Sequence, residues 1–227
     1  MLEGIKKLHF VGIGGVGMSA IAEVMLDKGY EISGSDLSES AVVKHLKAKG
    51  ATIYKGHDAL NVEGKEALVL SSAIHQDNPE LVAAKAKGLK LFHRSDILAY
   101  LLNDAKGIAV AGAHGKTTTS SMISVVLEHA KVDPTILIGG FVDYLKGNAK
   151  LGKSDYLVAE ADESDGSFLK FYPKIAVVTN IEDDHLDHYG TEENIYQAFK
   201  QFVGNIKEGG KAVLCFDNAK VRRLAAE

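Results

Sequence analysis

The sharpest chemical signal in the sequence is a glycine-rich loop that ends in Gly-Lys-Thr. It follows a short apolar run, Ile108–Ala111, and precedes a segment of helical length. In such loops, backbone N–H groups surround phosphate oxygens, the lysine reaches the β- and γ-phosphates, and the hydroxyl after it binds Mg²⁺. The candidate triphosphate-binding residues are Gly112, Ala113, His114, Gly115, Lys116, Thr117 and Thr118.

The spacing of this loop differs from the most common one. The pattern G-x-x-x-x-G-K-[ST] would place a glycine where the sequence has Val110, so the loop is the shorter G-x-x-G-K-T. A lysine that only caps a turn is the structural alternative. Because a strand-like run, two glycines, Lys116 and Thr117 occur in this order before a helix, the sequence favours a triphosphate site.

Acidic and histidine side chains follow two further strand-like runs. Glu160 ends one of these runs, and His185 comes shortly after the next. The carboxyl ends of parallel strands open onto the crevice where α/β sheets bind ligands, so both side chains are predicted near the loop. Thr117, Glu160 and His185 form the predicted metal site. Lys116, Glu160 and His185 are the predicted catalytic residues.

The charged residues beside these two positions are predicted to be solvated rather than to bind a ligand. This prediction applies to Asp162, Glu163 and Asp165, and to Asp187 and His188 further along. Taken without context, the histidines and acids of residues 182–188 would also fit the metal cluster of a hydrolase. The residues alone leave that alternative open.

A second glycine-rich loop lies near the N-terminus and fits the pattern G-x-G-x-x-G. Here a diphosphate would lie on the amides at a helix start, while an acid at the end of the next strand would accept hydrogen bonds from ribose hydroxyls or a base. A dinucleotide such as NAD fits this loop, as does any other nucleoside diphosphate, and a glycine turn without a ligand is the structural alternative. The candidate residues are Gly12, Gly14, Gly15, Val16, Gly17 and the acid Asp36.

Short β-branched runs alternate with amphipathic segments along the chain, which is the pattern of an α/β protein with parallel sheets. The predicted strands are Leu8–Gly12, Glu31–Gly34, Thr52–Tyr54, Ala67–Ser71, Lys90–Phe92, Ile108–Ala111, Thr135–Ile138, Tyr156–Glu160, Ile175–Thr179 and Ala212–Phe216. The predicted helices are Met18–Lys28, Ser40–Lys49, Pro79–Lys87, Asp96–Leu102, Thr117–Ala130 and Glu192–Ile206. Asn78 and Ser95 are predicted helix caps.

A polar, turn-prone stretch from Asn103 to Gly107 separates the two loops and predicts a domain boundary. Residues 1–104 are expected to form a Rossmann-like parallel-sheet domain. Residues 105–227 are expected to form part of a P-loop-type ATPase α/β domain.

Composition limits the classes of function. The 227 residues include 26 basic and 30 acidic side chains, a net charge of −4, so the chain has no basic surface typical of nucleic-acid binding. The single cysteine, Cys215, excludes an intramolecular disulfide framework. No apolar run approaches the roughly 18 residues of a membrane span. We therefore expect a cytoplasmic monomer or homodimer that binds neither nucleic acid nor membrane.

The two loops and the strand-end acids together resemble the Mur ligases of peptidoglycan synthesis. The matching stretches are Gly12–Ala20, Gly34–Asp36, Ser71–Ile74, Gly112–Thr119, Glu160–Asp165, Ser167–Leu169 and Thr179–His185. The sequence departs from the family at Ala113, where threonine is usual, and at Asp183, where proline is frequent, and neither change removes a side-chain ligand. The resemblance implies a UDP-sugar domain, a central ATP-binding domain that this chain does not complete, and a C-terminal domain that it lacks.

The resemblance also implies ATP-dependent formation of an amide bond. ATP and Mg²⁺ are the implied cofactors, and UDP-N-acetylmuramate and L-alanine are the implied small-molecule substrates. Residues Gly12–Gly17 would hold the UDP diphosphate, and Asp36 and Ser71 would contact the nucleoside or sugar, with His75 and Arg94 as further candidates. On its own, the chain is expected to be an inactive fragment.

Two other functions remain open on the residues alone. An NAD(P)-dependent oxidoreductase would use the first loop and leave Gly112–Thr119 without a role. A nucleotide-sensing binding module would use only the second loop. Tight binding of NADH, without binding of UDP-sugars or ATP, would favour the oxidoreductase, and titration with a UDP-sugar would separate the sensor from the ligase.

Overall fold

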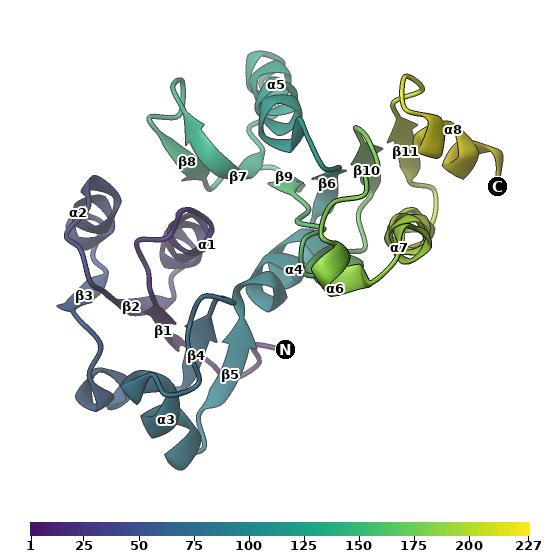
Figure 1. The fold of residues 1–227 in the computed structure, drawn as a ribbon. Coiled ribbons are helices and arrows are strands. Elements are labelled where there is room, and N and C mark those ends of the chain that lie inside the picture. The colour runs from purple at the N-terminus through teal and green to yellow at the C-terminus, as the bar shows by residue number, and fades with distance from the viewer. The chain divides into compact units, whose positions relative to one another are not determined.

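The computed structural model describes residues 1–227, in which strands and helices alternate along the chain (Figure 1). The chain forms two compact units. One consists of Met1–Leu98 with Ala149–Leu151, and the other of Ala99–Asn148 with Gly152–Glu227. No helix combines the length and the apolar content that crossing a bilayer requires.

The first unit contains a parallel five-stranded sheet with the strand order β3-β2-β1-β4-β5. Its strands are β1 (Lys7–Val11), β2 (Glu31–Asp36), β3 (Thr52–Lys55), β4 (Ala67–Leu70) and β5 (Lys90–His93). Its helices are α1 (Val16–Asp27), α2 (Ala41–Ala48) and α3 (Pro79–Ala86), with a 3₁₀ turn, η1, at Ala59–Val62. Figure 1 shows α1 and α2 on one side of the sheet and α3 on the other. The predicted Rossmann-like parallel sheet is confirmed.

The strand order of this sheet reverses at β1. The chain steps outward from β1 to β2 and β3, then returns to the other side of β1 to form β4 and β5. Ligands bind at such a reversal, outside the carboxyl ends of the strands. The ends of β1 and β4, at Val11 and Leu70, carry the first glycine loop and Ser71 respectively.

The second sheet is a mixed six-stranded sheet with the strand order β11-β10-β6-β9-β7-β8. Its strands are β6 (Lys106–Ala111), β7 (Thr135–Val142), β8 (Gly147–Lys150), β9 (Tyr156–Glu160), β10 (Ile175–Val178) and β11 (Lys211–Leu214). Helix α4 (Arg94–Asp104) precedes this sheet. The other helices are α5 (Lys116–His129), α6 (Leu186–Tyr189), α7 (Glu192–Gly204) and α8 (Ala219–Ala226), with a 3₁₀ turn, η2, at Ser167–Lys170.

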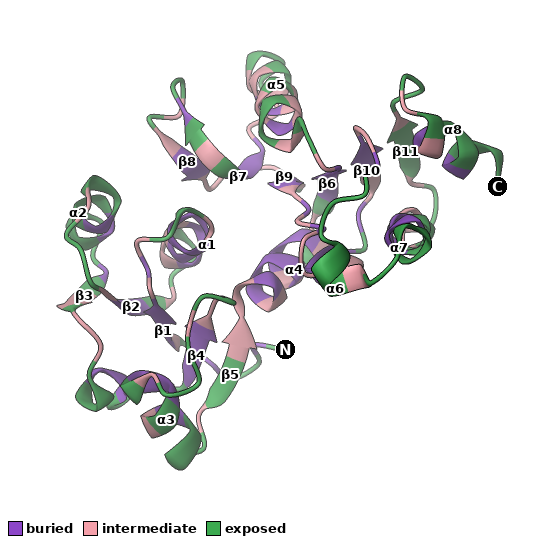
Figure 2. Ribbon diagram, in the orientation of Figure 1, coloured by how far each residue is buried: buried purple, intermediate pink, exposed green.

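Apolar side chains on the central strands hold the second sheet to its helices. Ile108, Val110, Val158 and Val177 form one buried cluster, against which side chains of α5 pack. An aromatic cluster contains Phe168, whose ring lies 5.2 Å from those of Phe199 and Phe202 on α7. Figure 2 shows the buried residues concentrated on the inner strands, whereas β11 is largely exposed. These contacts fix the carboxyl ends of β6, β9 and β10 relative to one another.

The predicted elements are present, and the structure adds to them the strand β8, the helices α6 and α8, and the 3₁₀ turns η1 and η2. The Asn78 cap is confirmed, because its side chain accepts the N–H groups of Glu80 and Leu81. The Ser95 cap is wrong. Helix α4 already begins at Arg94, and the Asp96 carboxylate accepts the preceding His93 N–H at 2.7 Å.

A buried carboxylate organises the α3 side of the first sheet. Glu80, fully buried at the start of α3, accepts hydrogen bonds from His9 (3.2 Å), Asn61 (2.7 Å), Ser35 (2.6 Å) and His57 (3.0 Å). Burial alone would raise the pKa of Glu80. The hydrogen bonds from His9, Ser35 and Asn61 outweigh burial and lower this pKa to about 2.

This lowered pKa makes the stability of the first unit sensitive to acid. A carboxyl whose pKa is lower in the folded than in the unfolded state contributes stability above its unfolded pKa and loses it as the pH falls. For Glu80 the contribution is about 3 kcal/mol, present above about pH 4.5 and lost towards pH 2. Urea unfolding between pH 7 and pH 3 should show this loss in the wild-type chain. The loss should be much smaller in Glu80→Gln, which does not titrate.

The exposed Glu63 provides a matched control, since its only ion pair is with Lys87 at 3.5 Å. Glu63→Gln should follow the wild-type acid dependence. Parallel acid curves for the wild type and Glu80→Gln would contradict the assigned role of Glu80.

Candidate functional site

The second glycine loop is a tight connection between β6 and α5. Gly112 (φ +139°) and Gly115 (φ +82°) adopt backbone conformations that side-chain-bearing residues rarely take. A Cβ atom on Gly112 would lie 2.0 Å from Thr179 Oγ1, so only glycine fits there. Helix α5 begins at Lys116, and its first amides have no carbonyl in a preceding turn. The loop therefore ends at a helix N-terminus, and free amides in such a position are able to bind an anion.

The end of β10 clamps the peptide of His114. The His114 N–H donates to Asn180 Oδ1 at 2.9 Å, and its carbonyl accepts from Thr179 Oγ1 at 2.7 Å and from Asn180 Nδ2 at 2.9 Å. These bonds give the loop a fixed shape without a ligand. They also occupy the His114 N–H, which is therefore not available to a ligand.

Lys116 folds back over its own loop. Its ammonium donates to the carbonyl oxygens of Gly112 (2.6 Å) and Ala113 (3.4 Å) and to Glu163 Oε1 (2.9 Å). Three acceptors of this kind hold a cationic group at the mouth of the loop.

Glu160 and Thr117 lie on either side of a glycine pair in β7. The Gly139 N–H donates to Glu160 Oε1 at 2.8 Å, and a Cβ on Gly140 would lie 3.0 Å from the Thr117 methyl group. Ser120 Oγ on α5 lies 3.5 Å from Glu160 Oε1. The strand-end carboxylate is thereby brought beside the first turn of α5, as the order of the motifs predicted.

His185 lies beside Glu163 rather than beside Glu160. It has a left-handed conformation (φ +60°) directly before α6, and its Nε2 is 3.8 Å from Glu163 Oε1. It makes no ion pair with Glu160, so the predicted metal residues are grouped around the loop without direct contact between these two. Asp187 and His188 are exposed, as predicted.

The prediction of a solvated acidic loop is wrong for Glu163. This residue is 4% exposed, and its carboxylate pairs with Lys116. The fold brings the loop after β9 next to the start of α5, so that the Glu163 carboxylate meets the Lys116 ammonium. Nothing in the local Asp-Glu-Ser-Asp pattern distinguishes Glu163 from its neighbours; only the requirement for a counter-ion to Lys116 could have indicated it.

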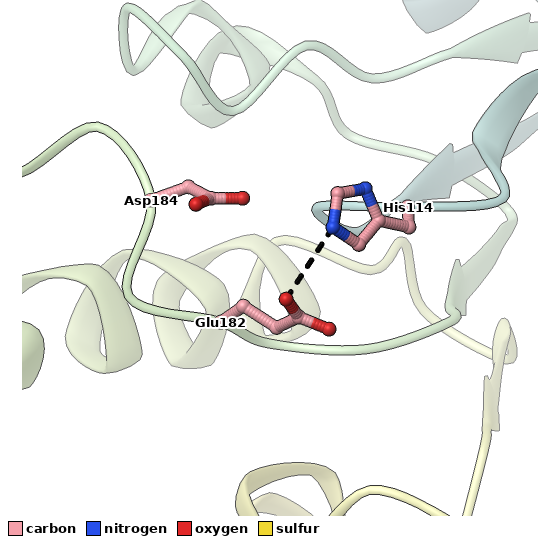
Figure 3. Close-up of side chains that lie close together, drawn as sticks. All are labelled: His114, Glu182 and Asp184. Atoms are coloured by element: carbon pink, nitrogen blue, oxygen red, sulfur yellow. Dashed lines mark ion pairs between the residues drawn. The ribbon is translucent and has the colours of Figure 1, made fainter.

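A second group of possible metal ligands lies on the surface beside the loop. The ligand atoms of His114, Glu182 and Asp184 lie within 4.8 Å of one another, and all three residues are exposed. Figure 3 shows the two acids on one loop facing His114 on the other, with His114 Nε2 3.4 Å from Glu182 Oε2. A small rotation of these side chains would allow them to share a cation.

The first glycine loop is held by the end of β2. Its Gly14 N–H donates to Asp36 Oδ2 at 2.8 Å, and the N–H groups of Gly12 and Ile13 donate to the Ser35 carbonyl at 2.9 and 3.0 Å. A Cβ on Gly14 would lie 2.7 Å from Asp36 Oδ2. The loop therefore needs glycine for a close contact, and Asp36 fixes its shape.

The other candidates of the first unit lie around this loop. Gly15 precedes α1, which begins at Val16. A Cβ on Gly17 would lie 3.4 Å from an Arg94 guanidinium nitrogen, which places Arg94 beside the loop. Ser71 is half-buried directly after β4, whereas His75 is exposed in the following turn.

Pockets lie at the carboxyl ends of both sheets. One of about 240 Å³ extends beyond Asp36 and is lined by Tyr54 and several lysines, among them Lys44 and Lys47. Another of about 270 Å³ is lined by Ser71 and its neighbours. In the second unit, a pocket of about 480 Å³ lies between the loop at His114 and the ends of β10 and β11.

Both units match models of the same protein family. The model of the Mur ligase family catalytic domain matches residues 7–106, and that of the Mur ligase middle domain matches residues 110–227. The chain belongs to the Mur ligase family. The two family models together cover both glycine loops, whereas an oxidoreductase or a nucleotide sensor would leave one loop without a role.

Among its relatives are proteins named UDP-N-acetylmuramate–L-alanine ligase. That of Pelotomaculum thermopropionicum is 54% identical over 221 residues, which are 97% of this chain and 48% of the relative. That of Magnetococcus marinus is 52% identical over 227 residues, which are 100% of this chain and 48% of the relative. The chain spans about half the length of these relatives.

Solved structures give the same family. A UDP-N-acetylmuramate–alanine ligase from Thermotoga maritima matches with a TM-score of 0.84 and 32% identity, over 96% of this chain and 51% of that one. A UDP-N-acetylmuramate:L-alanyl-gamma-D-glutamyl-meso-diaminopimelate ligase from Neisseria meningitides matches with a TM-score of 0.89 and 28% identity, over 98% and 75%.

Proposed function

We propose that this chain is the nucleotide-binding part of an ATP-dependent ligase that joins L-alanine to the lactyl carboxylate of UDP-N-acetylmuramate, a step in peptidoglycan precursor synthesis. The observation that carries the proposal is the pairing of two glycine loops on successive α/β units, each at the carboxyl end of its sheet. Identities of 52–54% to relatives named for this activity support the choice of substrates.

Such a reaction needs a leaving group. A carboxylate does not acylate an amine, because oxide would have to depart. Transfer of the γ-phosphoryl group of ATP to the carboxylate gives an acyl phosphate, and attack by the amine of L-alanine then releases phosphate. The task of the protein is to position the reactants and to neutralise charge.

The two glycine loops divide this work. We assign residues 1–104 to the UDP-sugar and residues 105–227 to ATP. Gly12–Gly17 would hold the diphosphate of the UDP-sugar, and Asp36 and Ser71 would border its nucleoside and sugar. The pocket of about 240 Å³ beyond Asp36 supports this assignment, because its three lysines outnumber its two acids, Asp36 and Glu39, and a net positive lining favours an anionic ligand.

The second loop would act on the triphosphate. Amides from Gly112 to Thr118, other than the His114 amide that Asn180 occupies, would surround the phosphates, and Lys116 would turn from its present acceptors to the γ-phosphate. Thr117, Glu160 and His185 would hold Mg²⁺, which supplies positive charge to the transferred phosphoryl group. Two of these three donors are oxygens, the ligands that Mg²⁺ prefers, and all three residues are grouped around the second loop.

The direct test uses the full-length protein with UDP-N-acetylmuramate, ATP, Mg²⁺ and L-alanine. Mass spectrometry should detect UDP-N-acetylmuramoyl-L-alanine together with stoichiometric release of phosphate. A parallel reaction supplies a tripeptide in place of L-alanine. Product only with the tripeptide would contradict the proposed substrate and would indicate an activity like that named for the Neisseria structure.

A further inference from the structure

Glu163 is a buried acid whose hydrogen bonding is incomplete. Its side chain is 5% exposed, and Oε1 lies 2.9 Å from Lys116 Nζ. Its other carboxylate oxygen, Oε2, is buried and has no hydrogen-bond partner. A carboxylate buried for structure alone is expected to have partners on both oxygens, so the free oxygen points to a group that arrives with a ligand.

Charge balance identifies the kind of group. When Lys116 turns towards a bound phosphate, Glu163 loses its ion-pair partner while a polyanion enters next to it. A buried carboxylate beside a triphosphate is strongly disfavoured unless a cation lies between them. His185 is the next possible partner, with Nε2 3.8 Å from Glu163 Oε1.

We propose that Glu163 binds a divalent cation together with His185 when the nucleotide is bound. This inference rests on the proposed function, because the cation enters with ATP. Two ligands about 2.1 Å from one ion are separated by at most about 4.2 Å, so the present 3.8 Å is already compatible with a shared ion. Carboxylate oxygens suit Mg²⁺ and Mn²⁺, and imidazole is a common ligand of divalent transition-metal ions. In this structure, the Lys116 ammonium is the positive charge beside Glu163.

The short helix α6 positions both members of this pair. His185 directly precedes α6, and Tyr189 ends it. The Tyr189 hydroxyl donates to the Glu163 carbonyl oxygen at 2.5 Å. One helical turn therefore fixes the backbone of the acid relative to the histidine.

The test measures metal binding rather than turnover. Full-length protein with a non-hydrolysable ATP analogue is titrated with Mn²⁺ and followed by electron paramagnetic resonance. Glu163→Gln is expected to raise the Mn²⁺ Kd about tenfold or more, the range seen when a group that supports a metal is lost. In EDTA, affinity for the analogue should be unchanged or higher, because Lys116 is no longer held by a carboxylate.

Glu182→Gln is the matched control, since it removes an acid from the exposed cluster beside the same loop. Its Mn²⁺ Kd should stay within twofold of the wild type. A loss of affinity in Glu182→Gln but not in Glu163→Gln would place the cation at the exposed cluster and overturn the proposal. A folded Glu163→Gln variant with the same Mn²⁺ Kd as the wild type would also overturn the proposal.

If Glu163→Gln does not fold, Glu163→Asp replaces it. This variant keeps the charge but withdraws the carboxylate by one methylene, so a several-fold loss of Mn²⁺ affinity is expected and a wild-type value overturns the proposal. A wild-type protein that binds neither Mn²⁺ nor the analogue would instead contradict the proposed function.

Discussion

Lys116→Ala in the full-length protein is expected to lower ATP-dependent turnover about 10³-fold, while affinity for the UDP-sugar stays within twofold. The ammonium lies at the mouth of the second loop, held by two loop carbonyls and by Glu163. Its removal takes away the positive charge that would balance the transferred phosphoryl group. The first unit holds its own loop through other residues, so UDP-sugar binding at the proposed site should not depend on this lysine. Phosphate release and calorimetry measure the two effects separately.

The same substitution also leaves Glu163 buried without its cation, which costs about 3–5 kcal/mol when a buried pair is broken. Thermal unfolding must therefore accompany the kinetics, and assays should be run well below the melting temperature of the variant. Lys153→Ala is the control, because Lys153 is an exposed lysine of the same unit. It should leave turnover unchanged. An equal loss of UDP-sugar affinity in Lys116→Ala would show that the two nucleotides do not have separate sites.

Gly14→Ala is expected to weaken binding of the UDP-sugar and to leave binding of the ATP analogue unchanged, the reverse of the Lys116→Ala pattern. A Cβ there would lie 2.7 Å from Asp36 Oδ2 and 2.9 Å from a methyl group of Val43, so the loop must move. Overpacking of this kind costs about 1–3 kcal/mol. We expect the Kd for the UDP-sugar to rise about tenfold or more, with the Kd for the ATP analogue unchanged. Isothermal titration calorimetry with each ligand measures both values.

Gly204→Ala is the matched control, since a Cβ at Gly204 meets no atom within 4 Å and its φ is not in the left-handed region. It should leave both affinities unchanged. If Gly14→Ala bound the UDP-sugar as tightly as the wild type, the first loop would not be the diphosphate site.

The parts of the fold that the sequence predicted well depend on local signals. Glycines, lysine and threonine at fixed spacing define the second loop, and β-branched runs define the inner strands of both sheets. Strand β8 was missed because Gly147–Lys150 contains no β-branched or aromatic residue and pairs at the sheet edge. Strand β8 pairs with β7 because the turn after β7 returns the chain beside it, not because its residues have a high β-propensity.

The missed site residue depends on contacts between distant positions. Glu163 meets Lys116 across 47 positions of sequence, and in the sequence it looks like any acid of a solvated loop. The buried Glu80 network has the same character, since His9 is 71 positions away from it. Composition and spacing do not encode such pairs, whereas the parallel sheets bring them together. Sequence patterns therefore located the loops, and the fold determined which acids surround them.

The most direct test of the account is simultaneous binding of two different nucleotides. Full-length protein is titrated with UDP-N-acetylmuramate, with a non-hydrolysable ATP analogue plus Mg²⁺, and with each ligand after saturation by the other. The account predicts one equivalent of each ligand bound at the same time, with Gly14→Ala weakening only the first and Gly112→Ala only the second. Displacement of one ligand by the other at a single site would contradict it.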